Sequence, residues 1–480
     1  MTLTTKGPLP SEPYDVTVVG AGVVGSAIAR ELAAHHRLRV ALVEASGDVG
    51  DGTSKASTAI LHTGFDAVPG SLEARLVREG QRLLAAYAAD SGIPVEPVGA
   101  LLVAWDEEQL AALPGLLDKA RRNAYTAARI IDADEVRARE PHLGPGALGA
   151  LDVPGESIIC PWTTTLAYAT QAVRGGVHLH LNCRVEKGNW VEYPAGGCRE
   201  LATSRGVLRT RYLINAAGLH ADDLDQQLLG EGKFAVTPRR GQLIVFDKLA
   251  RDLVRHILLP VPTALGKGVL VAPTVYGNVL LGPTAEELDD KTATGTTSDG
   301  LDTLRAKGRR ILPALLDEEV TTVYAGLRAA TEHDDYQIHA SPDERWITVG
   351  GIRSTGLTAS MAIAAYVVDL LADAAGPELD LTHAGDLDPV RMPNLGEAFP
   401  RPYQRADLIA TDPAYGSIVC HCERVTRGEI RDALISTVPP GSLDGLRRRT
   451  RARAGRCQGF YCGAEVRELF DGWGESGAAR

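Results

Sequence analysis

The feature that most constrains this fold is an ordered unit near the N-terminus of strand, glycine turn, helix, strand and acid. A β-branched run at 15–19 leads into Gly20-Ala-Gly22-Val-Val-Gly25, and an alanine-rich amphipathic stretch follows at about 26–35. A second apolar run at 40–43 ends in Glu44, 24 residues after Gly20. This order is typical of a dinucleotide-binding βαβ unit. We therefore expect an α/β protein with a Rossmann-type domain.

Each part of the unit has a physical task. Gly20 makes the tight turn, Gly22 lets the backbone approach a pyrophosphate, and Gly25 lets helix and strand pack closely. The N–H groups at the helix N-terminus then face the phosphates. Glu44 is expected to accept hydrogen bonds from the ribose of the adenosine half. The turn alone leaves both FAD and NAD open.

Three later segments favour FAD, and they carry a family resemblance. They read Gly52-Thr-Ser-Lys-Ala-Ser-Thr-Ala-Ile-Leu-His62-Thr-Gly64, Tyr212-Leu-Ile-Asn-Ala-Ala-Gly218 and Val349-Gly-Gly-Ile-Arg353-Ser-Thr-Gly356-Leu-Thr358. With them, residues 14 to about 385 resemble the D-amino-acid-oxidase-type flavoprotein superfamily. Within it, the chain is similar to the FAD subunits of anaerobic glycerol-3-phosphate dehydrogenases and to L-2-hydroxyglutarate dehydrogenases.

The resemblance implies an interleaved architecture. A Rossmann-type FAD-binding domain (about 14–84, 145–230 and 326–390) alternates with a mixed or antiparallel substrate sheet (about 85–144 and 231–325) that roofs the flavin. Alternating apolar patterns at 98–105, 241–246, 269–272 and 278–281 are consistent with strands of that sheet. The FAD contacts that the resemblance implies are Gly20, Gly22, Val24, Gly25, Glu44, Ala45, Thr53, Ser54, Ser57, Thr58, Val185, Ala217, Gly218, Gly351, Gly356, Leu357 and Thr358.

Hydride removal from an alcohol or amine carbon needs a base for the O–H or N–H proton and a cation for a substrate anion. By resemblance, His62 lies close to the flavin, Arg328 clamps the substrate anion, and Arg353 belongs to the flavin-facing turn. The alternatives are a core histidine for His62 and a structural ion pair for Arg353. Lys55 and Lys267 are weaker candidates, expected to be solvated or to support FAD.

The substrate stays open at this point. Glycerol-3-phosphate enzymes usually carry an arginine in the flavin-wrapping loop, where this chain has Lys55-Ala56-Ser57. Oxidation of a glycerol-3-phosphate-like polyol phosphate or a 2-hydroxy acid is the first hypothesis, and a hydroxyproline-type amino or imino acid is the second. A rival of another class is an iron–sulfur electron-transfer or sensing module with a non-catalytic flavin domain.

Four of the seven cysteines form two tight pairs near the C-terminus, Cys420-His-Cys422 and Cys457-Gln-Gly-Phe-Tyr-Cys462, with 34 residues between them. A C-x-C pair is short for structural zinc, whereas four thiolates suit a [2Fe-2S] cluster. The pattern resembles the bacterioferritin-associated-ferredoxin-like domain that occurs on this dehydrogenase family. We expect a [2Fe-2S] domain over 416–472, with zinc or redox-active thiols as alternatives.

Charge divides the chain in the same place. Residues 401–480 hold thirteen arginines, no lysine and ten acidic residues, a net charge of +3, against −14 for residues 1–400. The overall charge of −11 argues against nucleic-acid binding. Six arginines at 447–456 are expected either to be solvated, or to steady the cluster or dock an acidic partner. The proline-rich stretch 393–415 is predicted to be a linker.

The expected partners are a small anionic substrate and an electron-acceptor protein or quinone-linked subunit, with electrons leaving through the cluster. No apolar run looks long enough to span a bilayer, and no secretory signal is visible. We therefore expect a cytoplasmic protein, with peripheral attachment to the inner membrane left open. The first dozen residues are expected to be a disordered tail.

Overall fold

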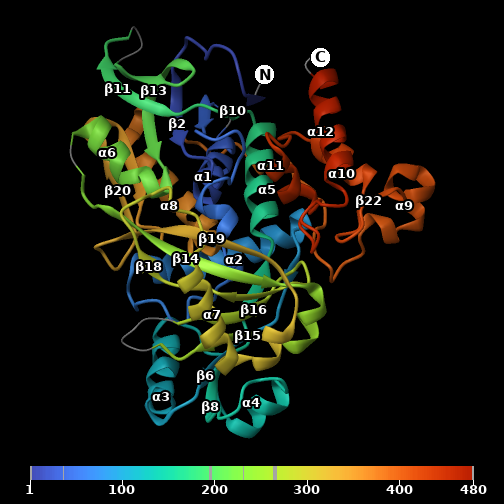
Figure 1. The fold of residues 1–480 in the computed structure, drawn as a ribbon. Helices are drawn as coiled ribbons and strands as arrows, with labels where there is room; N and C mark the ends of the chain where they lie inside the picture. Colours follow the sequence, from blue (N-terminus) through green and yellow to red (C-terminus); the bar gives the residue numbers. More distant parts are fainter. Residues whose placement is uncertain (1–2, 36, 194–196, 231, 263–267, 478–480) are drawn as a thin grey trace.

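The computed structural model describes residues 3–35, 37–193, 197–230, 232–262 and 268–477, and it contains two large sheets with a helical C-terminal domain beside them (Figure 1). The first sheet has the order β1-β10-β3-β2-β13-β12-β11, with β21 on β13 and β20 on β21. Its strands are β1 (Leu3–Thr4), β2 (Tyr14–Val19), β3 (Val40–Val43), β10 (His178–His180), β11 (Val185–Val191), β12 (Cys198–Thr203), β13 (Gly206–Asn215), β20 (Gln337–Ser341) and β21 (Trp346–Gly350).

The centre of this sheet is parallel, as the βαβ unit predicts. β3, β2, β13 and β21 pair in parallel, and both β2 and β3 are almost wholly buried because helices cover the two faces. One face carries α1 (Val23–Ala33), α2 (Leu72–Ser91), α5 (Pro161–Arg174) and α8 (Gly356–Ala375), and the other carries α6 (Ala221–Leu229). The Rossmann-type fold is thus confirmed.

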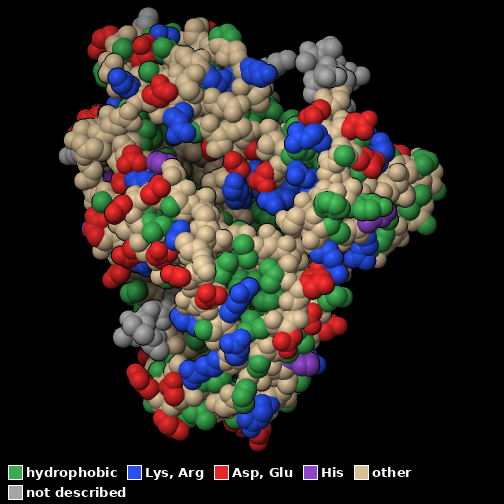
Figure 2. Space-filling view, in the orientation of Figure 1, with side chains coloured by type: hydrophobic (Ala, Val, Ile, Leu, Met, Phe, Trp, Pro, Cys, Tyr) green, Lys and Arg blue, Asp and Glu red, His purple; other side chains and the backbone are tan. Residues whose placement is uncertain are grey.

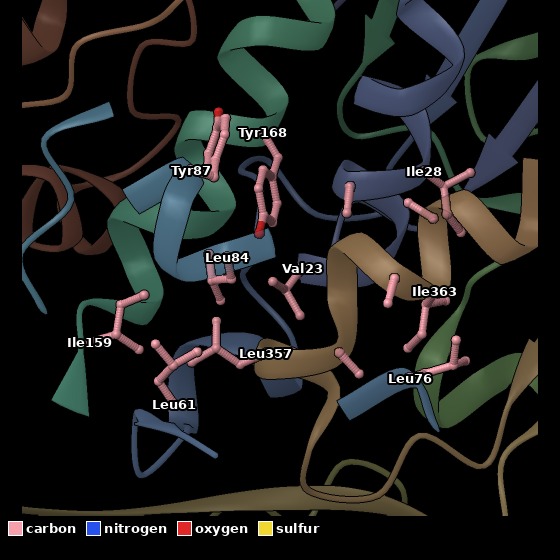
Figure 3. Packing of buried hydrophobic residues seen from close by; sticks show 14 of the residues in the cluster. Val23, Ile28, Leu61, Leu76, Leu84, Tyr87, Ile159, Tyr168, Leu357 and Ile363 are labelled. Carbon is pink, nitrogen blue, oxygen red and sulfur yellow. The ribbon is translucent and has the colours of Figure 1, made fainter. Parts of the chain in front are cut away.

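Helix α8 lies in the middle of the main core. Its Leu357 and Ile363 point among Val23 of α1 and Leu76 and Leu84 of α2 (Figure 3). α8 is also the one described helix that is long and apolar enough to cross a membrane by length and composition, contrary to the expectation that the chain has no such run. More than half of its apolar window is buried inside the protein, which explains the composition without a bilayer.

The second sheet is mixed, in the order β18-β14-β17-β16-β15-β6-β8-β7, with β19 on β14. It takes its strands from alternating parts of the chain: β6 (Ala100–Ala104), β7 (Arg129–Asp132), β8 (Gly149–Val153), β14 (Val236–Phe246), β15 (Ile257–Pro260), β16 (Leu270–Pro273), β17 (Val279–Gly282), β18 (Glu286–Glu287) and β19 (Val320–Thr331). β8 and the C-terminal half of β19 extend this sheet into ranges expected for the FAD domain, because both pair with its strands.

Helices cover the far side of the second sheet, away from the first. They are α3 (Glu107–Arg122), α4 (Ala133–Arg139) and α7 (Ser298–Ile311). A small sheet of β4 (Ile60–Leu61), β9 (Ser157–Ile159) and β5 (Val95–Glu96) joins the two halves of the oxidoreductase region.

The described part of the N-terminal segment is ordered, contrary to the expected tail. β1 pairs in parallel with β10, and the Arg205 guanidinium donates to the backbone carbonyls of Thr4, Lys6 and Gly7. A two-residue strand carries no periodic pattern, so sequence reading missed it.

The C-terminal domain has its own small core. It contains β22 (Ile418–Cys420), β23 (Val425–Thr426), α10 (Arg427–Leu434), α11 (Leu443–Thr450) and α12 (Gly463–Gly477). The stretch expected to be a linker includes α9 (Ala406–Thr411), and its buried Arg401 pairs with Glu429 of α10 at 3.0 Å. This stretch is therefore packed structure rather than a free tether.

Candidate active site and cysteine centre

The glycine turn between β2 and α1 tolerates no side chain at two of its positions. A Cβ on Gly20, whose φ is +102°, would lie 2.5 Å from the Ala216 carbonyl oxygen. A Cβ on Gly25 would lie 1.8 Å from the carbonyl oxygen of Gly20. The first N–H of α1, that of Val23, donates to Ser54 Oγ at 2.9 Å. The close backbone approach and the N–H groups of the helix start fit the pyrophosphate of FAD.

Glu44 is held in place by the same turn. Its Oε2 accepts the Ala21 N–H and its Oε1 accepts the Ser46 N–H, each at 2.8 Å. Burial raises the pKa of Glu44, and these two N–H groups act against that rise. Each carboxylate oxygen keeps a second lone pair, so both remain able to accept from a ribose hydroxyl.

The flavin-wrapping loop contains the 3-10 turn η1 (Thr53–Ala56) and connects the glycine turn to the second sheet. Thr53 Oγ1 donates to the Leu327 carbonyl at 2.9 Å, while Ser54 Oγ accepts from α1 as above. Ser57 Oγ accepts the N–H of Ala59, which has a left-handed φ of 63°. The loop is thus tied to both halves of the protein.

The remaining predicted FAD residues lie at strand ends and helix starts. Gly218 and Gly351 have positive φ and follow β13 and β21, and α8 begins at Gly356. The Thr358 hydroxyl accepts the His62 N–H at 3.0 Å, so the third FAD segment contacts the first. The others occupy α1 (Val24), the loop after β3 (Ala45), the flavin-wrapping loop (Thr58), the start of β11 (Val185), the turn after β13 (Ala217) and the first turn of α8 (Leu357).

His62 is oriented by a residue that sequence reading missed. Its Nδ1 lies 2.9 Å from Oε2 of Glu156, which is fully buried. Oε1 of Glu156 accepts both the backbone N–H of Thr63, at 2.6 Å, and its hydroxyl, at 2.8 Å. With Nδ1–H donated to the carboxylate, Nε2 is the ring nitrogen that can accept a proton. Glu156 lies 94 residues from His62, outside every motif, so no local signal pointed to it.

Strand β19 faces the flavin-wrapping loop with one row of side chains. Tyr324, Gly326 and Arg328 occupy every second position of the strand, so they lie on the same face of the sheet. The Tyr324 hydroxyl donates to the Ser57 carbonyl at 3.3 Å, and a Cβ on Gly326 would lie 2.5 Å from Cβ of Ala56. The row therefore places Arg328 on the face of the sheet that covers the flavin-wrapping loop.

The positive charge of Arg328 is poorly compensated by the side chains and carbonyl groups described around it. Its Nη1 donates weakly to the Thr284 carbonyl, at 3.5 Å, and within the described ranges no carboxylate pairs with it. Burial, together with the charge of Arg239, lowers the pKa of its guanidinium. A desolvated guanidinium needs an anionic partner, and a substrate phosphate or carboxylate would supply one.

The other predicted cations are engaged elsewhere or lie outside the described residues. Arg353 forms an ion pair with Glu73 at 3.0 Å, which favours the structural alternative for this residue. Lys55 pairs with Asp51 at 2.9 Å. Lys267 lies outside the described residues.

The four C-terminal cysteines come together in two pairs of interacting thiols, Cys420 with Cys462 and Cys422 with Cys457. Burial, followed by the Cys420 thiol, raises the pKa of Cys462 to about 12. Cys457 is the opposite case, because the backbone N–H of Tyr461 and its neighbours lower its pKa.

These four thiols suit the Cys₄ ligation of a [2Fe-2S] cluster. Two pairs of thiols match two irons with two thiolates each, and backbone N–H groups directed at sulfur stabilise the cluster's negative charge. The four cysteines therefore fit a [2Fe-2S] cluster.

Comparisons with known proteins agree with both regions. Residues 15–370 match the family model "FAD dependent oxidoreductase", and residues 418–471 match "BFD-like [2Fe-2S] binding domain". The chain is 37% identical to a glycerol 3-phosphate dehydrogenase of Caloramator mitchellensis, over 95% of this chain and 94% of the relative. It is 26% identical to one subunit of the anaerobic glycerol-3-phosphate dehydrogenase of Escherichia coli (strain K12), over 96% and 88%.

A solved structure shows the same architecture. The FAD-bound L-alpha-glycerophosphate oxidase of Mycoplasma pneumoniae superposes with a TM-score of 0.72 at 29% identity, over 80% of this chain and 99% of that one. The predicted cofactors, FAD and a [2Fe-2S] cluster, are thereby confirmed, and the zinc alternative falls away.

Proposed function

The chain belongs to the FAD dependent oxidoreductase family, and from this premise we propose that it oxidises glycerol 3-phosphate at the secondary hydroxyl and passes the electrons to its own [2Fe-2S] cluster. When bound, FAD accepts a hydride and the cluster accepts single electrons. His62 takes the hydroxyl proton on Nε2, and Glu156 stabilises the charge that the imidazole acquires. Arg328 binds the phosphate dianion and fixes the reacting carbon relative to His62.

The observation that carries this proposal is the partly buried Arg328, on the sheet face that covers the flavin-wrapping loop, without a carboxylate partner among the described residues. Phosphate suits it best, because a dianion can take a bidentate pair from the guanidinium and offset its charge. A 2-hydroxy acid is the second candidate, since a carboxylate can occupy the same position. Both candidates are anions, which suits an arginine that pairs with no carboxylate among the described residues.

The electrons need a way out of the protein, and the C-terminal domain is the proposed exit. The relative from Escherichia coli is named as a subunit of a larger dehydrogenase. We propose that this chain likewise hands electrons from its cluster to a partner subunit or carrier protein. The exposed side chains of Phe460 and Tyr461, which lie between two cluster cysteines, place this part of the cluster loop at the surface.

An anaerobic substrate panel tests the function. Glycerol 3-phosphate should bleach the flavin absorbance of the holoprotein within the turnover time, because it supplies both the hydroxyl and the anion. Glycerol, which lacks the phosphate, should bleach it more slowly by about two orders of magnitude or more at equal concentration. Faster bleaching by L-2-hydroxyglutarate or by hydroxyproline would assign the site to that substrate instead. A flavin that no substrate reduces would support the non-catalytic rival.

A further inference from the structure

The arginine-rich segment of the C-terminal domain faces inward, onto the loop that follows β3. Helix α11 packs beside α5, and the preceding turn meets the loop backbone directly. A Cβ on Gly441 would lie 1.8 Å from the Gly47 carbonyl oxygen, and a Cβ on Gly445 would lie 2.1 Å from Oδ2 of Asp48. The two backbone segments are therefore in close contact, and neither Gly441 nor Gly445 has room for a side chain. Figure 2 shows acidic and basic side chains gathered in the hollow where Figure 1 places α11.

Asp48 is the centre of this contact. Its two carboxylate oxygens accept from both terminal nitrogens of Arg449, each at 2.7 Å, and both side chains are nearly fully buried, at 3% and 4% exposure. Arg448 approaches the same carboxylate at 3.3 Å and also pairs with Asp51 at 2.9 Å. A bidentate pair of this kind forms only in a narrow range of geometries. Removing one partner takes away the main counter-charge of the other, which stays buried away from water.

All three guanidinium nitrogens of Arg449 donate hydrogen bonds at this contact. Besides Asp48, its guanidinium donates to the carbonyls of Val438 and Gly445 of its own domain. The arginine thus joins two backbone segments of the cluster domain to one carboxylate of the FAD region. This use of the segment differs from the solvated face and from the external docking surface that the sequence suggested.

The loop that Asp48 anchors is bonded to the phosphate-binding turn at both ends. Before Asp48, the Ser46 N–H shares the Glu44 carboxylate with the Ala21 N–H. After it, the Gly50 N–H donates to the Ala21 carbonyl at 2.8 Å. Ala21 lies inside the glycine turn itself. A displacement of Asp48 must therefore move the residues that hold Glu44 and the turn.

We propose that Arg449 is a positioning residue for FAD, which acts by holding Asp48 and so keeps the loop after β3 closed on the glycine turn. FAD affinity then depends on the docked state of the cluster domain, through the loop rather than through a direct contact with the flavin ring. The inference rests on the family's use of FAD and goes beyond the proposed substrate. It holds whichever alcohol or amine is oxidised.

The test is the Kd of FAD for the apoprotein with its cluster retained, measured by flavin fluorescence. Arg449→Leu should raise this Kd at least about tenfold, because the buried Asp48 carboxylate then loses its bidentate partner and keeps the weaker contact with Arg448 at 3.3 Å, so the loop opens. Arg449→Lys, which keeps the charge and loses the fork, should give an intermediate value. Arg447→Leu is the matched control, since Arg447 lies on the same helix and pairs with Asp444 at the surface, and its Kd should equal that of the wild type.

Iron and sulfide content then separate the proposed role from a general loss of folding. Arg449→Leu with a full cluster and an unchanged FAD Kd would overturn the proposal. If that variant loses its cluster, Asp48→Asn decides, because it removes the partner charge from the FAD side without changing any residue of the C-terminal domain. A raised Kd in Asp48→Asn supports the proposal, and a wild-type Kd contradicts it. Loss of substrate oxidation with normal FAD binding would instead concern the proposed function.

Discussion

Replacing Glu156 with glutamine should lower kcat for the oxidation by about 10²–10⁴-fold, with FAD binding retained. The reason is the tautomer of His62. The two donors of Thr63 require an oxygen at the position of Oε1, so the new amide nitrogen must face Nδ1 of His62. That nitrogen donates a hydrogen bond, which makes Nδ1 the acceptor and puts the proton on Nε2. The nitrogen that should take the substrate proton then already carries one.

A matched control is available in the same chain. Glu140 is a second buried glutamate that accepts from a histidine Nδ1, that of His256, at 2.7 Å, and also from two backbone N–H groups. It lies just after α4, outside the flavin site. Glu140→Gln should disturb folding to a similar extent and leave kcat close to that of the wild type. Holoenzyme carrying Glu156→Gln with a kcat within about threefold of the wild type would contradict the role of Glu156.

Arg328→Ala should reduce kcat/KM for glycerol 3-phosphate by about 30- to 5,000-fold, equivalent to the roughly 2–5 kcal/mol lost with a buried charge-assisted pair. The loss should be specific to the anion. For neutral glycerol the same variant should change kcat/KM by less than about fivefold, because glycerol has no phosphate for the guanidinium to bind.

Arg239→Ala is the control for this arginine. Arg239 lies opposite Arg328 in the register of β14 and β19, but it pairs with Glu287 at 2.6 Å. Steady-state kinetics of the two variants on both substrates provide the measurement. An equal loss for glycerol and glycerol 3-phosphate in Arg328→Ala would show a structural role and remove the phosphate assignment.

Local sequence patterns predicted the Rossmann-type fold and the cysteines of the cluster. The βαβ unit is continuous in sequence, and each of its glycines has a steric reason that the structure repeats at Gly20 and Gly25. The two cysteine pairs are likewise local. Short-range spacing was therefore enough to predict a dinucleotide site and a set of cluster thiolates, and the resemblance carried by three further segments favoured FAD over NAD.

Contacts between segments that are distant in the sequence could not be predicted from such local patterns. Glu156 meets His62 through the pairing of β4 with β9, and Asp48 meets Arg449, which lies 401 residues further along the chain. Neither acid belongs to a motif, and a buried ion pair gives no periodic signal. The division at 393–415 also suggested two independent modules, whereas the buried salt bridge between Asp48 and Arg449 joins the cluster domain to the FAD region.

The most direct test of the proposed electron route is one anaerobic titration of the holoprotein with glycerol 3-phosphate, followed by visible absorbance and by electron paramagnetic resonance. We predict that flavin absorbance falls and that the signal of a reduced [2Fe-2S] cluster rises in the same samples. An unchanged flavin spectrum would contradict the assigned substrate. A bleached flavin beside a cluster that stays oxidised, although dithionite reduces it, would contradict the route of electrons through the C-terminal domain.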